Sequence, residues 1–166
     1  HIGKPLAPVA VVGETELRGT RQQFWPDKSI FTTTIYKYEI LANRMRELAY
    51  LNDGITITLT DLRKDEEGKI RSEKFYSEGG LKDFVRYIES TRTSLFNDVI
   101  YLNTEKQGIP IEVAIMYNTA YSENLHSYVN NINTIEGGTH LQGFRAALTR
   151  TLKTYAEQEC TKELEK

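Results

Sequence analysis

The alternation of apolar and polar positions predicts most of the strands of this 166-residue chain. In residues 55–60, isoleucine and leucine alternate with threonine. Successive side chains of a strand point to opposite faces, so this segment is expected to form a strand with one apolar face and one hydroxyl face. A charged turn at residues 64–69 then returns the chain into a second strand at residues 70–76.

A second strand pair is expected at residues 99–103 and 109–117, joined by a turn through Lys106-Gln107-Gly108. Apolar side chains occupy every second position from 109 to 117, which places them on one face. A shorter strand at residues 125–129 is followed by a polar stretch, residues 130–138, that is expected to be a loop.

A hairpin is also expected near the start of the sequence. Residues 9–12 contain three valines and end at a glycine, and residues 20–25 form a second run that is closed by Pro26. Valine and aromatic residues favour strands, whereas glycine and proline end them.

Periods of three and four residues predict three helices. The first runs from about Tyr38 to Leu51, the second follows the Gly79-Gly80 pair, and the third runs from about Thr139 to Glu159. The third helix carries a continuous apolar stripe, formed by Leu141, Phe144, Leu148, Leu152 and Tyr155. Helices and strands together predict an α+β fold.

Composition and charge reduce the number of function classes that fit the chain. The chain is 39% hydrophobic, which allows a packed core, and its 21 basic and 23 acidic residues give a net charge of −2. This charge argues against a globally basic nucleic-acid binder but leaves a local basic face open. A single cysteine, Cys160, excludes an intramolecular disulfide framework and is typical of a reducing compartment.

No apolar run approaches the ~20 residues that span a bilayer, so no membrane partner and a cytoplasmic location are expected. The sequence has neither a signal peptide nor an initiator methionine. It is therefore expected to be a piece of a longer protein.

The sequence offers no self-contained active site. His1, His126 and His140 have no cysteine or acidic neighbour at metal-ligand spacing, and Cys160 has no basic partner nearby. Phosphate-binding glycine loops and nucleophile-elbow motifs are also missing. We therefore predict no catalytic residue and no metal ligand.

The third helix is the remaining candidate. Two glycines precede Thr139 at its start, and helix N-termini attract anions. Arg145, Arg150 and Lys153 project from its body. The spacing fits a helix that faces phosphates, but on spacing alone a capped surface helix with solvated cations is favoured.

Residues 137–145, Gly-Gly-Thr-His-Leu-Gln-Gly-Phe-Arg, resemble the transducer signature of the B subunits of bacterial type II topoisomerases, which include DNA gyrase and topoisomerase IV. Four further segments match this family in order and spacing: Val12-Gly13-Glu14-Thr15-Glu16 with Gly19-Thr20 and Phe24-Trp25-Pro26, residues 40–52, residues 78–81, and residues 104–106. The resemblance covers essentially the whole chain.

The resemblance implies two domain pieces. Residues 1–70 would be the C-terminal part of a GHKL ATPase domain, and residues 71–166 a transducer domain that stops before its Gln-Thr-Lys loop. The family's transducer is a two-layer domain with a left-handed βαβ crossover, whereas general chain geometry favours a right-handed one.

The implied function is that of the B subunit of DNA gyrase, which uses ATP to supercoil DNA negatively by passing one duplex through another. These residues would couple ATP binding and hydrolysis to movement of the DNA gate, and would line the DNA cavity. The alternatives are the B subunit of topoisomerase IV and a non-catalytic interaction module that reuses the fold.

The implied cofactors of the intact subunit are ATP and Mg²⁺. The implied partners are double-stranded DNA, the gyrase A subunit in an A2B2 heterotetramer, and a second B subunit that pairs on ATP binding. Of the family's nucleotide-site residues only Thr20, which helps to hold adenine, has a match, and Gln22 departs from the pattern. This chain alone is therefore expected neither to bind nor to hydrolyse ATP.

For DNA, the resemblance makes Arg145 the first candidate, with Arg150 and Lys153 beside it. Their contacts would be to phosphates, so binding would be independent of base sequence and sensitive to salt.

Overall fold

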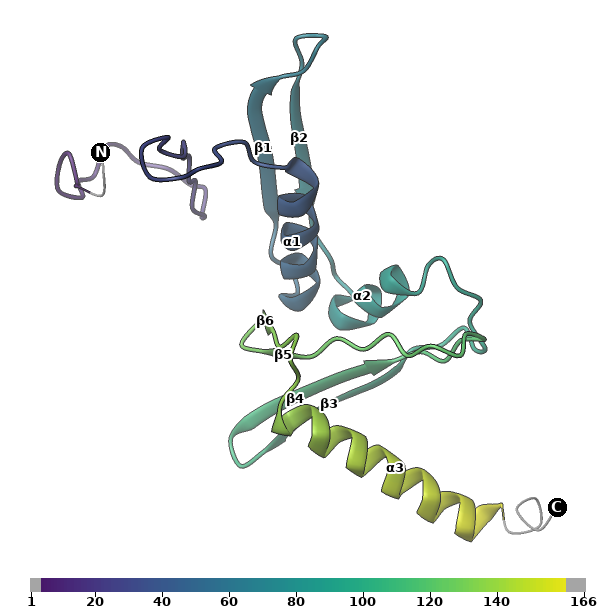
Figure 1. Cartoon of the computed structure of the whole chain (residues 1–166). Helices are drawn as coiled ribbons and strands as arrows, with labels where there is room; N and C mark the ends of the chain where they lie inside the picture. The colour runs from purple at the N-terminus through teal and green to yellow at the C-terminus, as the bar shows by residue number, and fades with distance from the viewer. Residues whose placement is uncertain (1–3, 161–166) are drawn as a thin grey trace. The chain divides into compact units, whose positions relative to one another are not determined.

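The computed structural model describes residues 4–160 (Figure 1). The chain divides into two compact units, residues 1–41 and residues 42–166, and each is described by itself.

The first unit has no helix or strand between residues 4 and 37. The hairpin expected from residues 9–12 and 20–25 is therefore a wrong prediction. Val9 and Val12 are fully exposed, with no apolar surface against them. An isolated two-stranded hairpin is marginal in water, so strand propensity alone does not form one. Local order is limited to contacts such as the edge-to-face pair of Phe24 and Tyr36, with ring centroids 5.5 Å apart.

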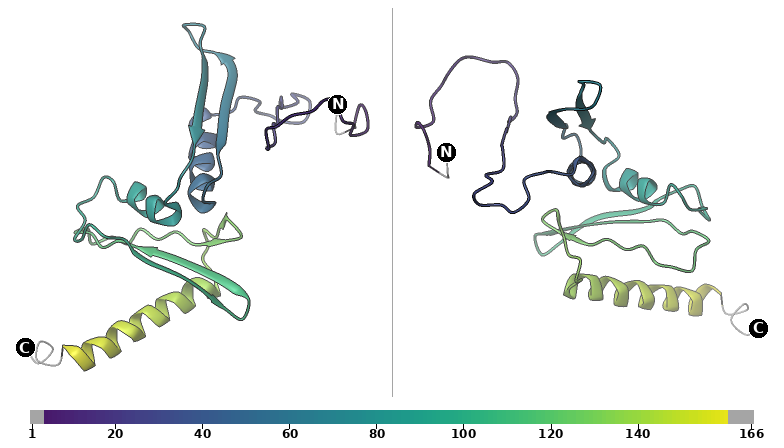
Figure 2. Two further views of the ribbon diagram at one scale, coloured as in Figure 1. Left: turned by 180° about the vertical axis from the view of Figure 1, so that it is seen from behind. Right: turned by 45° about the horizontal axis from the view of Figure 1, so that its top comes forward.

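Helix α1 (Tyr38–Leu51) has the bounds that its periodicity predicts. Its buried side chains are Ala42 and Ala49, seven residues apart and so on one face. In the second unit α1 runs beside the antiparallel hairpin of β1 (Ile57–Lys64) and β2 (Ile70–Phe75), as the views in Figures 1 and 2 show. Phe75, at the end of β2, is the third buried apolar side chain.

Helix α2 (Gly80–Ile88) supplies the fourth, Phe84, which stacks on Tyr50 of α1 at 5.3 Å. The glycine at its start is required by geometry. Gly80 has φ +52°, and a Cβ atom there would lie 2.0 Å from an Asp53 carboxylate oxygen. Only glycine adopts this conformation at no steric cost and leaves that space free.

Two tight hairpins follow. Strands β3 (Ile100–Lys106) and β4 (Ile109–Ile115) are joined through Gln107 and Gly108, and both residues have positive φ angles, 55° and 76°. Such turns match the natural twist of antiparallel strands.

Strands β5 (Tyr128–Val129) and β6 (Ile132–Asn133) are likewise joined by a two-residue turn with positive φ angles, 50° at Asn130 and 64° at Asn131. The strand predicted at residues 125–129 is thus shorter than expected. Part of the predicted loop at 130–138 is a strand, because asparagine tolerates the left-handed conformation and turns the chain back on itself.

Helix α3 (Thr139–Glu159) also has its predicted bounds, and it follows the β5–β6 hairpin along the chain (Figure 1). None of its residues is buried. Its apolar stripe is half-buried near the start, at Leu141, Phe144 and Leu148, and exposed at Leu152 and Tyr155.

Antiparallel pairing joins every strand pair within residues 4–160, in three two-stranded sheets. Together with the three helices of the same residues, these sheets confirm the α+β class. A βαβ crossover joins two parallel strands, and residues 4–160 contain no parallel pair. These residues therefore do not test the expected left-handed crossover, which stays a prediction. Among the described helices, none is both long and apolar enough to cross a bilayer.

Candidate nucleic-acid interface

Arg145 lies in the second turn of α3 with its side chain 56% exposed. Its Nη2 donates hydrogen bonds to both carboxylate oxygens of Glu123, at 3.0 and 2.9 Å. Glu123 belongs to the segment between β4 and β5, and its side chain is 57% exposed. An ion pair this open to solvent contributes only about 0–1 kcal/mol. The guanidinium is held in place, yet it remains accessible to another anion.

Lys153 has an even looser partner. Its Nζ lies 3.8 Å from a carboxylate oxygen of Glu157, one helical turn further on, and both side chains are exposed. Arg150 is exposed and has no ion-pair partner among residues 4–160. All three cations predicted to contact DNA therefore stand at the surface of α3.

Their order around the helix follows from about 100° per residue. Lys153 lies between the other two, and together they cover an arc of about 140°. Along the axis, Arg145 and Lys153 are roughly 12 Å apart. This arrangement is an exposed basic strip on a helix surface, and it has no enclosed pocket.

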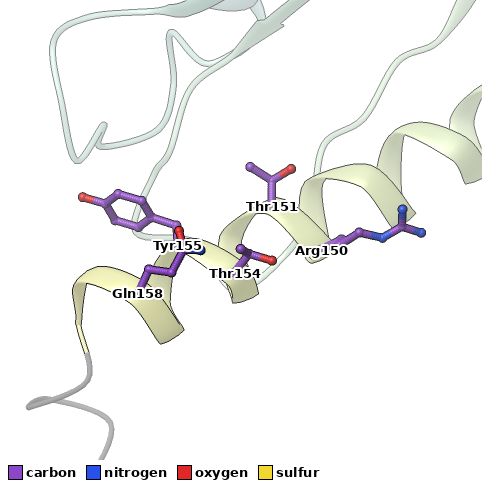
Figure 3. Close-up of a pocket in the computed structure, with 5 residues that line it drawn as sticks. All are labelled: Arg150, Thr151, Thr154, Tyr155 and Gln158. Atoms are coloured by element: carbon purple, nitrogen blue, oxygen red, sulfur yellow. The ribbon is translucent and has the colours of Figure 1, made fainter.

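The depression nearest to this strip does not form a ligand site. It has a volume of about 360 Å³ and is lined by α3 alone, through Arg150, Thr151, Thr154, Tyr155 and Gln158. Figure 3 shows Arg150 and Tyr155 pointing in different directions, so their polar ends do not meet. We assign no small-molecule site here.

Thr20, the residue predicted to contact adenine, lies exposed in the irregular first unit. Its hydroxyl has no hydrogen-bond partner within the described part of the chain. Residues 4–160 also contain no group of three or more His, Cys, Asp or Glu side chains that could hold a metal ion. Within residues 4–160 these observations give no assembled site for ATP or Mg²⁺, and the role of Thr20 stays a prediction.

Sequence reasoning missed a polar network between α1 and the β5–β6 hairpin. Glu47 accepts hydrogen bonds from Arg44 and from the Tyr128 hydroxyl. Arg44 Nη2 also donates to the Asn131 carbonyl oxygen at 2.9 Å, and Asn131 Nδ2 donates to Asn52 Oδ1 at 2.8 Å. Burial, and then the hydrogen bond to Glu47, hold the pKa of Tyr128 well above its ordinary value.

A second set of hydrogen bonds continues from this hairpin to α3. Thr134 Oγ1 donates to the Ser127 carbonyl oxygen at 2.9 Å and lies 3.1 Å from Nε2 of His140, in the first turn of α3. The two sets together link the end of α1, through the hairpin, to the start of α3. The Asn130-Asn131 pair is a turn signal that could have revealed the hairpin from sequence.

Comparison with known proteins relates the chain to gyrase B proteins. The sequence profile of the family described as DNA gyrase B matches residues 80–166. The chain is 58% identical to the DNA gyrase B protein of Cytophaga aurantiaca over 94% of its length, and 45% identical to that of Halalkalibacterium halodurans over 95%. It spans 33% and 24% of these two relatives.

Solved structures show the same likeness. The crystal structure of the 43K ATPase domain of Thermus thermophilus gyrase B, in complex with an aminocoumarin, matches with a TM-score of 0.66 at 28% identity, over 80% of this chain and 35% of that one. The B subunit of the DNA gyrase from Myxococcus xanthus has the same fold, with a TM-score of 0.70 at 23% identity, over 80% of this chain and 36% of that one.

Proposed function

Because the chain belongs to the DNA gyrase B family, we propose that it is part of the B subunit of an ATP-dependent type II topoisomerase. The intact enzyme would introduce negative supercoils by passing one duplex through another. Its cofactors would be ATP and Mg²⁺, and its partners duplex DNA, the A subunit in an A2B2 assembly, and a second B subunit. We place this activity in the cytoplasm.

Within that enzyme we assign residues 1–70 to the end of the ATPase domain and residues 71–166 to the transducer. The family profile begins at residue 80, close to this boundary, which supports the division. The hydrogen bonds from α1 through the β5–β6 hairpin to α3 cross this proposed boundary between residues 70 and 71. They support a role in transmitting movement of the ATPase domain to α3.

The observation that carries the proposal is the exposed basic strip of α3, which lies inside the segment that the family profile matches. We propose that Arg145, Arg150 and Lys153 contact phosphates of the captured duplex. Because phosphates carry no sequence information, such contacts would serve any duplex, as strand passage requires. Binding should weaken as salt rises, since each neutralised phosphate releases counterions.

The test is Arg145→Gln in the full-length protein, assayed with the A subunit, ATP and relaxed plasmid. Supercoiling should fall while the free energy of unfolding stays unchanged, because the side chain is exposed. Arg63→Gln is the matched control. Arg63 is a similarly exposed arginine, 53%, paired with Asp61 in β1, and its substitution should leave supercoiling intact.

Supercoiling at the wild-type rate by Arg145→Gln would remove that residue from the DNA path. Relaxation or decatenation without supercoiling, by the unmodified enzyme, would instead identify a topoisomerase IV. No ATP-dependent change of topology, from a folded protein with a functional partner, would leave a non-catalytic interaction module.

A further inference from the structure

Arg145 is the cation of the basic strip that is held by a residue from outside α3. Both oxygens of Glu123 bind one nitrogen, Nη2, across 22 residues of sequence. The N–H groups of Nη1 and Nε have no partner among residues 4–160. A guanidinium presents five N–H donors in a planar fork. Glu123 accepts from Nη2 alone and leaves the N–H groups of the other two nitrogens open to another acceptor.

We propose that Glu123 competes with DNA phosphate for Arg145. In the absence of a duplex, Glu123 neutralises and orients the guanidinium. When a phosphate arrives, it takes over the donors and Glu123 is displaced. This inference rests on the proposed DNA contact of Arg145 and adds a residue that sets its strength.

The chemistry supports exchange between the two anions. Carboxylate and phosphate both accept the paired N–H donors of arginine in bidentate fashion. Because the Arg145 and Glu123 side chains are more than half exposed, their attraction is screened and a stronger anion can replace it. If Glu123 stayed in place, its charge would lie within a few ångströms of the phosphate and repel it.

As a consequence, the contact of Arg145 with a DNA phosphate is weak when Arg150 and Lys153 do not also bind the duplex. Arg150 has no acidic partner among the described residues, and the Lys153 pair is longer at 3.8 Å, so only Arg145 must give up a close carboxylate to bind. A duplex that touches Arg145 alone would be released, whereas one seated along the strip would be retained. Such behaviour suits an enzyme that must let a duplex pass.

The experiment measures the affinity of the full-length protein for a short fluorescent duplex, by anisotropy at low and moderate salt. Glu123→Gln removes the competing charge but keeps the shape of the side chain, and should tighten binding about two- to fivefold, the gain expected for removal of one exposed charge. Arg145→Gln should weaken binding. The double variant should bind like Arg145→Gln, because Glu123 acts only through that arginine.

Glu67→Gln is the control for net charge. Glu67 is an exposed carboxylate paired with Lys69 in the β1–β2 turn, so its substitution changes the charge equally without touching α3. It should leave the affinity close to that of the wild type. Circular dichroism of each variant confirms that it is folded before binding is compared.

Three results would overturn the inference: unchanged or weaker binding by Glu123→Gln, an equal gain from Glu67→Gln, or a gain that survives in the double variant. They are distinct from failure of the proposed function itself. If Arg145→Gln binds DNA as tightly as the wild type, the DNA contact is wrong. If it binds more weakly while Glu123→Gln changes nothing, only the competition is wrong.

Discussion

Two parts of the second unit use charged and polar side chains in opposite ways. Between α1 and the β5–β6 hairpin, Glu47 is only 18% exposed and accepts hydrogen bonds from two side chains. On α3, the Arg145, Arg150 and Lys153 side chains are exposed, and they have at most one partner each among residues 4–160.

The difference follows from the cost of removing polar groups from water. A partly buried carboxylate or hydroxyl must find a partner, so the network at Glu47 is complete and serves the fold. An exposed cation has no such requirement, and its interaction with solvent or with a nearby acid is easily replaced. The side chains that the fold does not need are thus the ones available for the proposed contact with DNA.

The largest difference between the two parts should appear on loss of an aromatic ring. Phe84→Ala removes a buried side chain that contacts Tyr50 and Tyr128, and should lower the free energy of unfolding by ~3–5 kcal/mol. Phe144→Ala, at a half-buried position of α3, should cost about 1–2 kcal/mol. Urea denaturation measures both, and equal losses would contradict the comparison.

Alanine in place of glycine should act with opposite signs at the start of α2, which packs against α1, and within α3. At Gly80, φ +52° and the nearby Asp53 carboxylate make Gly80→Ala destabilising by about 1–3 kcal/mol. At Gly143 within α3, a Cβ atom meets nothing within 4 Å, so Gly143→Ala should stabilise by about 0.5–1 kcal/mol. Thermal unfolding of the two variants would show the sign, and stabilisation by both would argue against the close approach at Gly80.

The smallest effect concerns a single hydroxyl. Tyr128→Phe deletes the hydrogen bond to Glu47 and should cost about 1 kcal/mol at neutral pH. Tyr155→Phe on α3 should cost close to nothing, because that hydroxyl has no partner among the described residues and the residue is 60% exposed.

The pH dependence sharpens this test. The pKa of Tyr128 is raised by folding, so its contribution is fully present below the unfolded value of about 10 and is lost as the pH rises above it. The stability difference between the wild type and Tyr128→Phe should therefore shrink from about pH 10 upward. A difference that stays constant into the alkaline range would mean that Tyr128 is not protected from ionisation.

Local patterns predicted the helices well and the first hairpin badly. The bounds of α1 and α3 follow from contacts three and four residues apart, which any helix satisfies within itself. The valines of residues 9–12 have strand propensity, but a strand needs a partner and a surface to cover, and the described structure provides neither. The β5–β6 hairpin was missed because its strands are only two residues long.

The sequence alone determined the family, the bounds of α1 and α3, and the identity of the three candidate cations, since each depends on neighbouring residues or on a motif in order. Only the tertiary structure decided which charges are paired. Glu123 meets Arg145 across 22 residues, and Tyr128 meets Glu47 across 81. No local pattern encodes such pairs, because they form only when packing of other elements brings the two segments together.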